Sequence, residues 1–185
     1  IIILDEENYE RKQNKLSTLL EGVRTRHVFI DSKGNLWICS YGDMGLIMVD
    51  EKDKITSYSQ AKTGINGKKL RCAAELPDGT IALSSTVALN FIKDGGLVGQ
   101  INLEDGLESQ ILTMYVDDEG TLYAGSDGNG IYVIKNNHID SIINDEQGLN
   151  SMVILRIVSC DRGLIYVTSN GLYFDAGSHE EIRKL

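Results

Sequence analysis

One seven-residue pattern recurs four times along the chain, and it limits the possible folds more than any other feature. Each copy begins with glycine, continues through apolar residues and ends in a small residue followed by serine. Positions 34, 79, 120 and 163 carry the opening glycines, which are therefore 45, 41 and 43 residues apart. A repeat of forty-odd residues made of strand-like segments is typical of β-propellers, in which each repeat forms one four-stranded blade. The four opening residues are Gly34, Gly79, Gly120 and Gly163.

A second motif has the same period. Its glycines stand at positions 22, 64, 106 and 148, each 42 residues from the next, and each is followed by Val, Ile or Leu. A glycine followed by an aliphatic residue also recurs at 45–46, 130–131 and 171–172, whereas the second unit has Ala88-Leu89 there. Motifs in step at one period predict an all-β chain: a β-propeller segment of about four four-stranded blades plus a half blade at the N-terminus.

Each unit divides into four short apolar strands separated by turn residues. The first unit predicts strands at 25–31, 35–40, 45–49 and 54–58, and the third at 111–117, 121–125, 130–134 and 138–143. We interpret residues 6–20 as a long polar hairpin loop. Residues 1–5 match the third strand at 46–50, which suggests that the chain starts within a preceding blade. The predicted units are 1–22 (the end of that blade), 23–66, 67–108, 109–150 and 151–185.

The charge of the chain bears on its partners. The net charge is −9 and the isoelectric point is about 4.8. Nucleic acids are bound by a surplus of Lys and Arg, so nucleic acid is not expected as a partner. The sequence has no run of about 18 apolar residues, so no direct membrane insertion is expected.

Residues able to carry chemistry are scattered through the units. Neither the histidines nor the cysteines have the spacing of a metal site, and no nucleophile motif is present. The segment 127–130 fits neither a dinucleotide loop nor a calcium loop. We expect no metal, no cofactor and no catalytic residue, and we interpret the acidic pairs as turn or surface residues. The residues considered are His27, His138, His179, Cys39, Cys72, Cys160, Asp117, Asp118, Glu180 and Glu181.

Trp37, Tyr123 and Tyr166 follow the opening glycine at the same distance in three units. An aromatic row could stack against sugar rings. Equivalent positions in central strands favour packing between blades instead, because burial of such rings stabilises the fold. We therefore expect them to be structural repeat residues.

Strand topology predicts which rim of the blades carries function. Strands within a blade are antiparallel, so the loops between second and third strands share one rim with the connections between blades. These loops are longer and more varied than the tight turns opposite, and recognition usually resides in such loops. We expect a ligand or partner to bind this rim. The candidate residues are Arg24, Arg26, Tyr41, Asp43, Asn66, Arg71, Asp127, Asn129, Asn150 and Asn170.

Residues 31–40 read Asp-Ser-Lys-Gly-Asn-Leu-Trp-Ile-Cys-Ser and are followed by Gly45-Leu46. This stretch resembles the repeat of the two-component regulator propeller family, whose consensus is roughly Asp-x-x-Gly-Asn-Leu-Trp-Ile-Gly-Thr and then Gly-Leu. The resemblance covers all four units. Residues 117–126 match next best, residues 161–169 are shortened, and residues 77–85 are weakest because Ala82 replaces the aromatic residue.

The resemblance implies a sensory propeller outside the cytoplasmic membrane, which provides the input of a histidine kinase, hybrid regulator or diguanylate cyclase. It carries over no signalling residue, since those lie in other domains of the family. A general protein-interaction propeller, soluble and in the cytoplasm, is the alternative, and a propeller lyase or hydrolase is the third hypothesis. Expected partners are a small polar ligand such as a carbohydrate, a protein, or a second copy that associates through exposed blade edges or receptor dimerisation.

Overall fold

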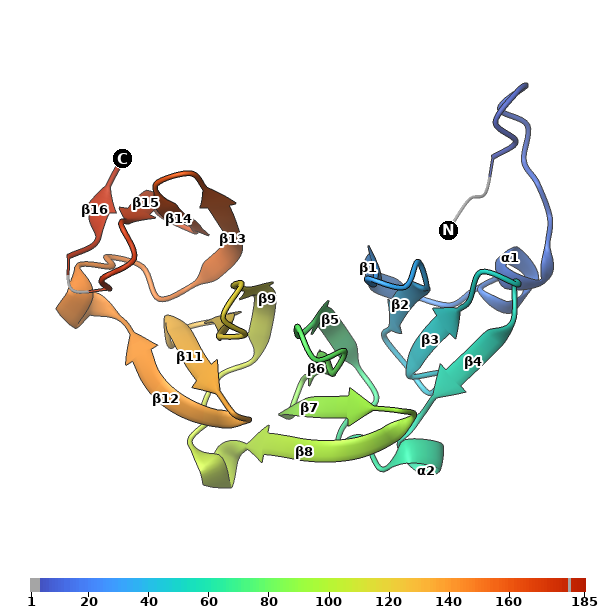
Figure 1. The fold of residues 1–185 in the computed structure, drawn as a ribbon, viewed down its shortest axis with the longest axis horizontal. Helices are drawn as coiled ribbons and strands as arrows, with labels where there is room; N and C mark the ends of the chain where they lie inside the picture. Colours follow the sequence, from blue (N-terminus) through green and yellow to red (C-terminus); the bar gives the residue numbers. More distant parts are fainter. Residues whose placement is uncertain (1–3, 180) are drawn as a thin grey trace.

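The computed structural model describes residues 4–179 and 181–185 and contains four antiparallel sheets of four strands each. Each sheet is formed by four consecutive strands, and the sheets stand side by side in an open arc (Figure 1). The predicted fold class, a segment of a β-propeller, is confirmed. Blade 1 comprises β1 (Thr25–Ile30), β2 (Leu36–Ser40), β3 (Leu46–Val49) and β4 (Ile55–Tyr58); blade 2 comprises β5 (Leu70–Glu75), β6 (Ile81–Ser85), β7 (Ala88–Lys93) and β8 (Gly96–Asn102). Blade 3 comprises β9 (Ile111–Val116), β10 (Leu122–Ser126), β11 (Ile131–Lys135) and β12 (His138–Ile143); blade 4 comprises β13 (Ile154–Cys160), β14 (Gly163–Thr168), β15 (Gly171–Asp175) and β16 (Arg183–Lys184).

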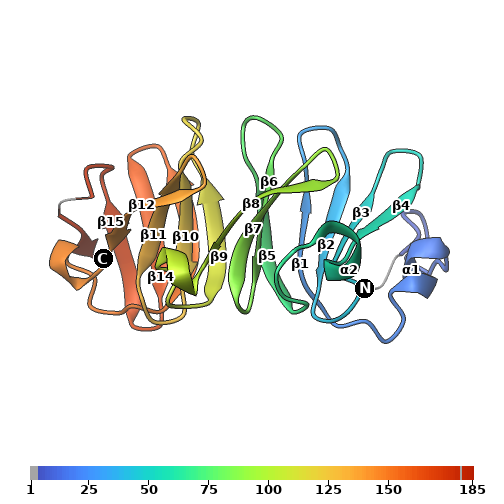
Figure 2. The ribbon, with the colours of Figure 1, turned by 90° about the horizontal axis from the view of Figure 1, so that it is seen from below.

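The first strand of each blade lies on the concave side of the arc, and neighbouring first strands contact one another (Figure 1). The fourth strands lie toward the convex side. Short helices join the blades there: α2 (Gln60–Thr63), η1 (Leu103–Asp105) and η2 (Asp145–Gln147). Figure 2 shows the tight hairpin turns along one edge of the arc, which we call the turn rim. The opposite edge, where the second strands lead into the third and one blade leads into the next, is the loop rim.

The Asp-x-x-Gly-Asn-x-Trp motif of blade 1 forms one hydrogen-bonded unit. The carboxylate of Asp31 accepts hydrogen bonds from the backbone N–H groups of Lys33 (3.0 Å) and Asn35 (2.8 Å). It also accepts from Asn35 Nδ2 and from Trp37 Nε1, both at 2.8 Å. Burial alone would raise the pKa of Asp31, but these four hydrogen bonds outweigh it and hold the pKa below its ordinary value. The motif therefore ties the turn to the buried ring on β2.

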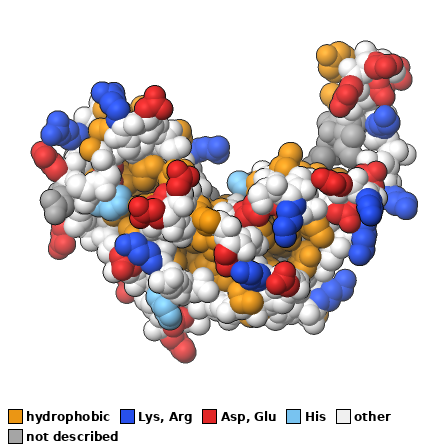
Figure 3. All heavy atoms as spheres, viewed as in Figure 1, with side chains coloured by type: hydrophobic (Ala, Val, Ile, Leu, Met, Phe, Trp, Pro, Cys, Tyr) orange, Lys and Arg blue, Asp and Glu red, His pale blue; other side chains and the backbone are white. Residues whose placement is uncertain are grey.

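Apolar side chains fill the space between neighbouring blades. One cluster around Trp37 and Leu83 joins blades 1 and 2, and another around Tyr132 and Phe91 joins blades 2 and 3. A third cluster, which includes Tyr123, joins blades 3 and 4. Figure 3 views the turn rim, where charges of both signs surround apolar side chains that remain visible between the blades. Stability thus comes chiefly from contacts between successive repeats.

The interpretation of residues 6–20 as a hairpin loop is wrong for its last part, where α1 (Lys15–Leu19) forms. Asn14 and Ser17 cap this helix by reciprocal side chain-to-backbone hydrogen bonds. Leu16 and Leu20 are buried against the outer face of blade 1. Before the helix, the predicted half blade is represented by an antiparallel bridge between Leu4 and Arg11. Residues 1–3, the start of its predicted strand, lie outside the described residues, as does Glu180.

Strand register in blade 4 corrects the predicted equivalence of Tyr166 with Trp37 and Tyr123. Ser126 pairs with the start of the first strand in blade 3, and in blade 4 the corresponding partner is Thr168. The pattern in blade 4 is therefore one residue out of step with the other repeats. Because successive side chains of a strand point to opposite faces, Tyr166 faces blade 3, and Ile165 takes the position equivalent to Tyr123.

The buried indole of Trp37 provides a test of the packing between blades. Its ring stacks on Tyr58 and Phe29 with centroid distances of 5.5 and 6.2 Å. We expect Trp37→Ala to lower the free energy of unfolding by about 3–5 kcal/mol, measured by urea denaturation, because it removes these contacts and leaves a cavity. The exposed Ile30→Ala is the control and should change stability by less than about 0.5 kcal/mol. An unchanged free energy of unfolding for Trp37→Ala would contradict the assigned role.

Candidate functional site

The densest group of candidate residues surrounds Tyr41 on the loop rim, at the junction of blades 1 and 2. The guanidinium carbons of Arg24 and Arg26 lie 5.1 and 4.8 Å from the centre of the Tyr41 ring. The ammonium of Lys69 lies 5.6 Å from the same point, and that of Lys68 forms an ion pair of 2.8 Å with Asp43. We call Arg24, Arg26, Lys68 and Lys69 with Tyr41 the cationic cluster. The predicted residues Arg24, Arg26, Tyr41 and Asp43 are thus brought together.

Backbone pairing fixes the cluster in place. The N–H of Tyr41 donates a 2.7 Å hydrogen bond to the carbonyl of Arg24, and Tyr41 also forms an antiparallel bridge with Lys69. These contacts join the loop after β2 to the segments that lead into β1 and β5. The ring is half-buried, and the two arginines are exposed around it. The site therefore rests on strand ends of two adjacent blades.

The positive charges occupy matching positions in blades 1 and 2. Thr25 pairs with Ser40, and Leu70 pairs with Ser85, so these two strand starts are equivalent. The residues on either side are basic in both blades. In blades 3 and 4, where Ile111 and Ile154 take this position, they are neutral. The flanking residues are, in blade order, Arg24 and Arg26, Lys69 and Arg71, Gln110 and Leu112, and Val153 and Leu155.

Arg71 and Asn66 lie beside the cluster in the sequence of blade 2. Arg71 is half-buried, and within the described part of the chain its buried Nε has no hydrogen-bond partner. The backbone N–H of Asn66 donates to the side-chain oxygen of Asn90 (2.7 Å), and the Asn90 amide donates to the carbonyl of Asn66 (3.2 Å). Because Asn90 is fully buried, it anchors the loop that carries Lys68 and Lys69.

The remaining candidates brace the loop rim of blades 3 and 4, and Asp127 also forms an antiparallel bridge with Val153 before blade 4. Asn129 donates to the hydroxyl of Tyr132 (2.7 Å) in blade 3, where the backbone of Asp127 also donates to the carbonyl of Gln110 (2.9 Å). Asn170 donates to the carbonyl of Asn150 (3.2 Å) in blade 4. These contacts give Asn129, Asn150 and Asn170 structural partners on the same rim.

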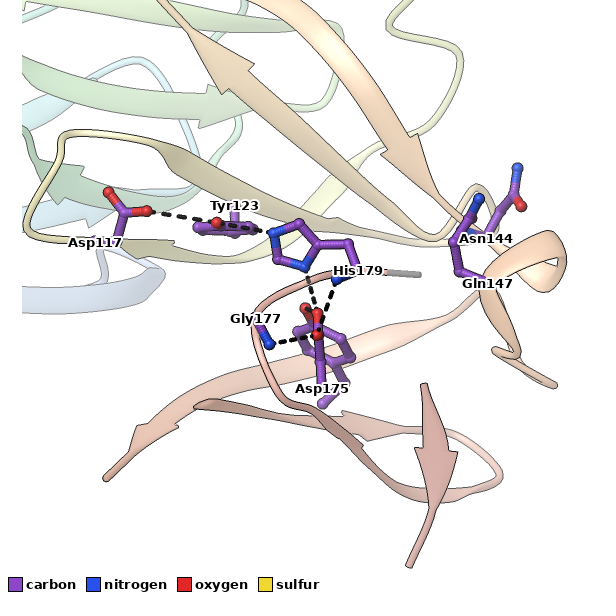
Figure 4. Close-up of polar contacts among 8 residues, drawn as sticks. Asp117, Tyr123, Asn144, Gln147, Asp175, Gly177 and His179 are labelled. Carbon is purple, nitrogen blue, oxygen red and sulfur yellow. Dashed lines mark hydrogen bonds and ion pairs between the residues drawn. The ribbon is translucent and has the colours of Figure 1, made fainter. Parts of the chain in front are cut away.

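A polar network that sequence reasoning missed joins blades 3 and 4 near the turn rim (Figure 4). The buried carboxylate of Asp175 accepts hydrogen bonds from the hydroxyl of Tyr166 (2.6 Å) and the N–H of Gly177 (2.8 Å), and it contacts Nδ1 of His179. The other ring nitrogen of His179 lies 3.2 Å from the hydroxyl of Tyr123. That hydroxyl also donates to Asp117 (3.4 Å). No sequence motif indicated this set, since Tyr123 and His179 are 56 residues apart.

Electrostatics of this network favour a structural role. Burial would raise the pKa of Asp175, but hydrogen bonds from Tyr166, His179 and Gly177 outweigh it and lower the pKa below its ordinary value. Burial, with the nearby charge of Asp117, raises the pKa of Tyr123 to about 12. Asp175 is therefore ionised and Tyr123 is neutral at pH 7. Both ring nitrogens of His179 are engaged, so the network ties the loop after β15 to blade 3.

The cysteines and histidines are otherwise dispersed. Cys39 and Cys72 are buried, which raises the pKa of Cys39 well above its ordinary value and that of Cys72 to about 12. Cys160 is exposed, and all three are free thiols. Across residues 4–179 and 181–185, no group of three potential metal-binding side chains is found. Over the same residues, no helix is long and apolar enough to cross a membrane.

Comparisons with known proteins establish the fold. No protein-family model matches the sequence, and no curated protein matches it significantly. The chain is similar to the extracellular domain of BT3049, described as a hybrid two-component system of B. thetaiotaomicron (TM-score 0.70, 19% identity, 97% of this chain and 25% of that one). It is also similar to the extracellular domain of BT4673, described as a one-component system of the same organism (TM-score 0.68, 18% identity, 100% and 30%).

An enzyme shares the same architecture. A catalytically inactive histidine-to-alanine variant of virginiamycin B lyase from Staphylococcus aureus, solved with quinupristin, gives a TM-score of 0.68 at 16% identity, over 88% of this chain and 55% of that one. The chain thus spans from about a quarter to about half of the lengths of these three proteins. At such identities the likeness shows a β-propeller architecture, which sensors and enzymes both use.

Asp175→Asn tests the network. We expect it to lower the free energy of unfolding at pH 7 by about 2–3 kcal/mol, because an amide replaces a buried acceptor of several hydrogen bonds. The pKa of Asp175 is lowered in the folded protein, so its contribution is present above about pH 4 and is lost as the pH falls through the folded-state value. The stability difference between wild type and variant, measured by urea denaturation, should therefore shrink in acid. The control is Asp161→Asn at an exposed turn, and a difference that stays constant down to pH 2 would contradict the role.

Proposed function

We propose that this chain is a non-catalytic sensory β-propeller segment in the extracytoplasmic part of a bacterial membrane signalling receptor. Its fold, shared with extracellular domains of two signalling systems, and its Asp-x-x-Gly-Asn-Leu-Trp repeat support this proposal. The observation that carries it is the cationic cluster, a group of exposed charged side chains fixed on the loop rim by two adjacent blades. Rigid scaffolds commonly present recognition residues in this way.

Binding at this rim would act through the receptor. A ligand held by blades 1 and 2, or a second receptor copy docked there, changes the relative energies of two receptor arrangements and so changes the output. The output domain in this proposal is a histidine kinase, a hybrid regulator or a diguanylate cyclase. The ligand is a small polar molecule, with carbohydrates included.

The surroundings of His179, Cys39 and Cys72 support a binding role over a catalytic one. Catalysis by an imidazole requires a ring nitrogen within reach of the substrate, and both nitrogens of His179 are engaged. Thiol catalysis requires an accessible thiolate, but Cys39 and Cys72 are buried with raised pKa values.

The cellular compartment is tested by labelling intact source cells. A single cysteine introduced as Lys52→Cys, in a variant whose exposed Cys160 is changed to serine, places a thiol in an exposed turn. We expect a membrane-impermeant maleimide to label it on intact cells, with the outer membrane permeabilised where one is present. The matched control is the Cys160→Ser parent without the new thiol. Labelling only after the cytoplasmic membrane is broken would favour a cytoplasmic interaction scaffold and overturn the proposal.

The binding rim is tested by charge reversal in the full-length receptor. We expect Arg24→Glu with Arg71→Glu to reduce the ligand-dependent output about tenfold or more, because two cations that favour the ligand become repulsive. The control is Lys52→Glu with Lys54→Glu, which makes the same charge change on the turn rim. Equal responses of the two double variants in a transcriptional reporter would count against a loop-rim site.

Self-association is proposed for the open face of blade 4. Leu46, Leu89 and Ile131 lie at equivalent positions near the start of the third strands of blades 1, 2 and 3 and are all fully buried against the next blade. Their counterpart Leu172 is 45% exposed, and Val158, on the first strand of the same sheet, is 42% exposed. This face can therefore receive another sheet, and in this proposal a second copy of the chain supplies it.

This association is tested by sedimentation velocity on the isolated chain. We expect wild type to form dimers whose fraction grows with concentration, and Leu172→Lys to remain monomeric over the same range, since a buried charge opposes the contact. Val98→Lys, on a similarly exposed apolar residue of blade 2, is the control. Equal dimer fractions in the two variants would contradict this use of the face.

A further inference from the structure

The cationic cluster concentrates positive charge on a protein whose net charge is negative. The chain carries a net charge of −9, yet Arg24, Arg26 and Lys69 gather at one ring, and Lys68 is the neighbour of Lys69 in the sequence. Asp43 pairs with Lys68, and both of these side chains are more than half exposed. In the part of the chain that the structure describes, no carboxylate lies within ion-pair distance of Arg24, Arg26 or Lys69. The local positive charge is thus left largely uncompensated.

The distances make this arrangement unfavourable without a further partner. The guanidinium carbons of Arg24 and Arg26 lie 5.1 and 4.8 Å from one ring centre, so they are at most about 10 Å apart. This limit is about one Debye length at 0.1 M salt, so solvent ions do not fully screen their repulsion. The face of the Tyr41 ring attracts each cation weakly, which orients the charges without neutralising them.

Arg71 adds a second observation. Arg71 lies on β5, two residues after Lys69. Its buried Nε has no hydrogen-bond partner among the described residues. Unpaired buried donors are uncommon in folded proteins and need an explanation. An acceptor bound at the strand ends of blades 1 and 2 would reduce the repulsion between the neighbouring cations, and a shift of the Arg71 side chain toward it would give this donor a partner.

We infer that the cationic cluster binds a small multivalent anion, with two or more carboxylate or phosphate groups, between the strand ends of blades 1 and 2. Two arginine forks suit paired anionic oxygens, which they can engage bidentately. A single negative charge cannot meet both arginines and Lys69 equally well. A long polyanion is disfavoured because it would extend beyond the cluster over a surface with excess negative charge.

The ring of Tyr41 is a positioning element in this site. It is half-buried and fixed by its backbone bonds to Arg24 and Lys69, and three cations surround it. Cations held in place before binding lose less side-chain entropy when the anion arrives. Tyr41→Phe keeps the aromatic face, whereas Tyr41→Leu removes it, so these variants separate positioning from a contact made by the hydroxyl.

The test is isothermal titration of the chain with citrate, pyrophosphate and acetate at low ionic strength. We expect citrate or pyrophosphate to saturate one site and acetate to bind about tenfold more weakly or worse. Arg24→Gln with Arg26→Gln should weaken binding about tenfold, while Lys52→Gln with Lys54→Gln, the turn-rim control, should change it less than about twofold. Tyr41→Phe should bind like wild type and Tyr41→Leu should bind several-fold more weakly. Binding of citrate alone indicates a carboxylate ligand, and binding of pyrophosphate alone indicates a phosphate ligand.

Absence of saturable binding by both anions, or equal weakening in the two double glutamine variants, would overturn the inference. The inference rests on the proposed loop-rim binding site, but the two can fail separately. Loss of receptor output in Arg24→Glu with Arg71→Glu, together with no anion binding, would leave the sensory proposal standing. If the protein binds the anion but is labelled only after the cytoplasmic membrane is broken, the anion site is supported and the proposed receptor function is overturned.

Discussion

Each blade has two apolar faces and can cover neither by itself, and the rest of the structure depends on this constraint. Blades 1 to 3 bury one face against the following blade, through Leu46, Leu89 and Ile131. The face of blade 1 that points away from blade 2 is covered by α1 and the residue after it, through Leu16 and Leu20. Blade 4 has the same kind of face with Leu172 exposed. Contacts between repeats, more than propensity within them, therefore decide which surfaces are available for association.

The junctions between blades are built from similar parts in different ways. In blade 1 a carboxylate at the first turn holds the indole of Trp37, and in blade 3 the equivalent Asp117 reaches the hydroxyl of Tyr123. Blade 4 is one residue out of step, so Tyr166 bonds instead to Asp175 on β15. His179 then connects that carboxylate to Tyr123 across the junction. A buried ring tied to a carboxylate thus recurs, although the residues that supply it change.

The sequence predicts the parts of this fold that follow from local repetition. Strand limits predicted for the first and third repeats agree with the structure within one residue, because glycines and turn residues mark each strand end. The strand register of blade 4 could not be predicted from the sequence. The face on which Tyr166 lies is decided by strand pairing across the sheet, because spacing from the opening glycine does not determine that pairing. Burial of Leu16 and Leu20 stabilises α1, and His179 meets partners distant in sequence. Both depend on tertiary contacts that a single repeat does not encode.

For the candidate site residues too, the sequence predicts the position on the rim, whereas tertiary contacts decide which residues come together. Strand topology was sufficient to place Arg24, Arg26 and Tyr41 on one rim, but the convergence of their charges depends on the Tyr41–Lys69 bridge between blades. Asn129 and Asn170 share that rim, yet their amides are used within their own blades. The position of a residue on the loop rim is thus a weaker indication of ligand binding than a charge that lacks a partner in the fold. The cationic cluster has such a requirement, since its charges repel one another and, of its four cations, only Lys68 has a carboxylate partner among the described residues. An anion would supply what the fold leaves unpaired there.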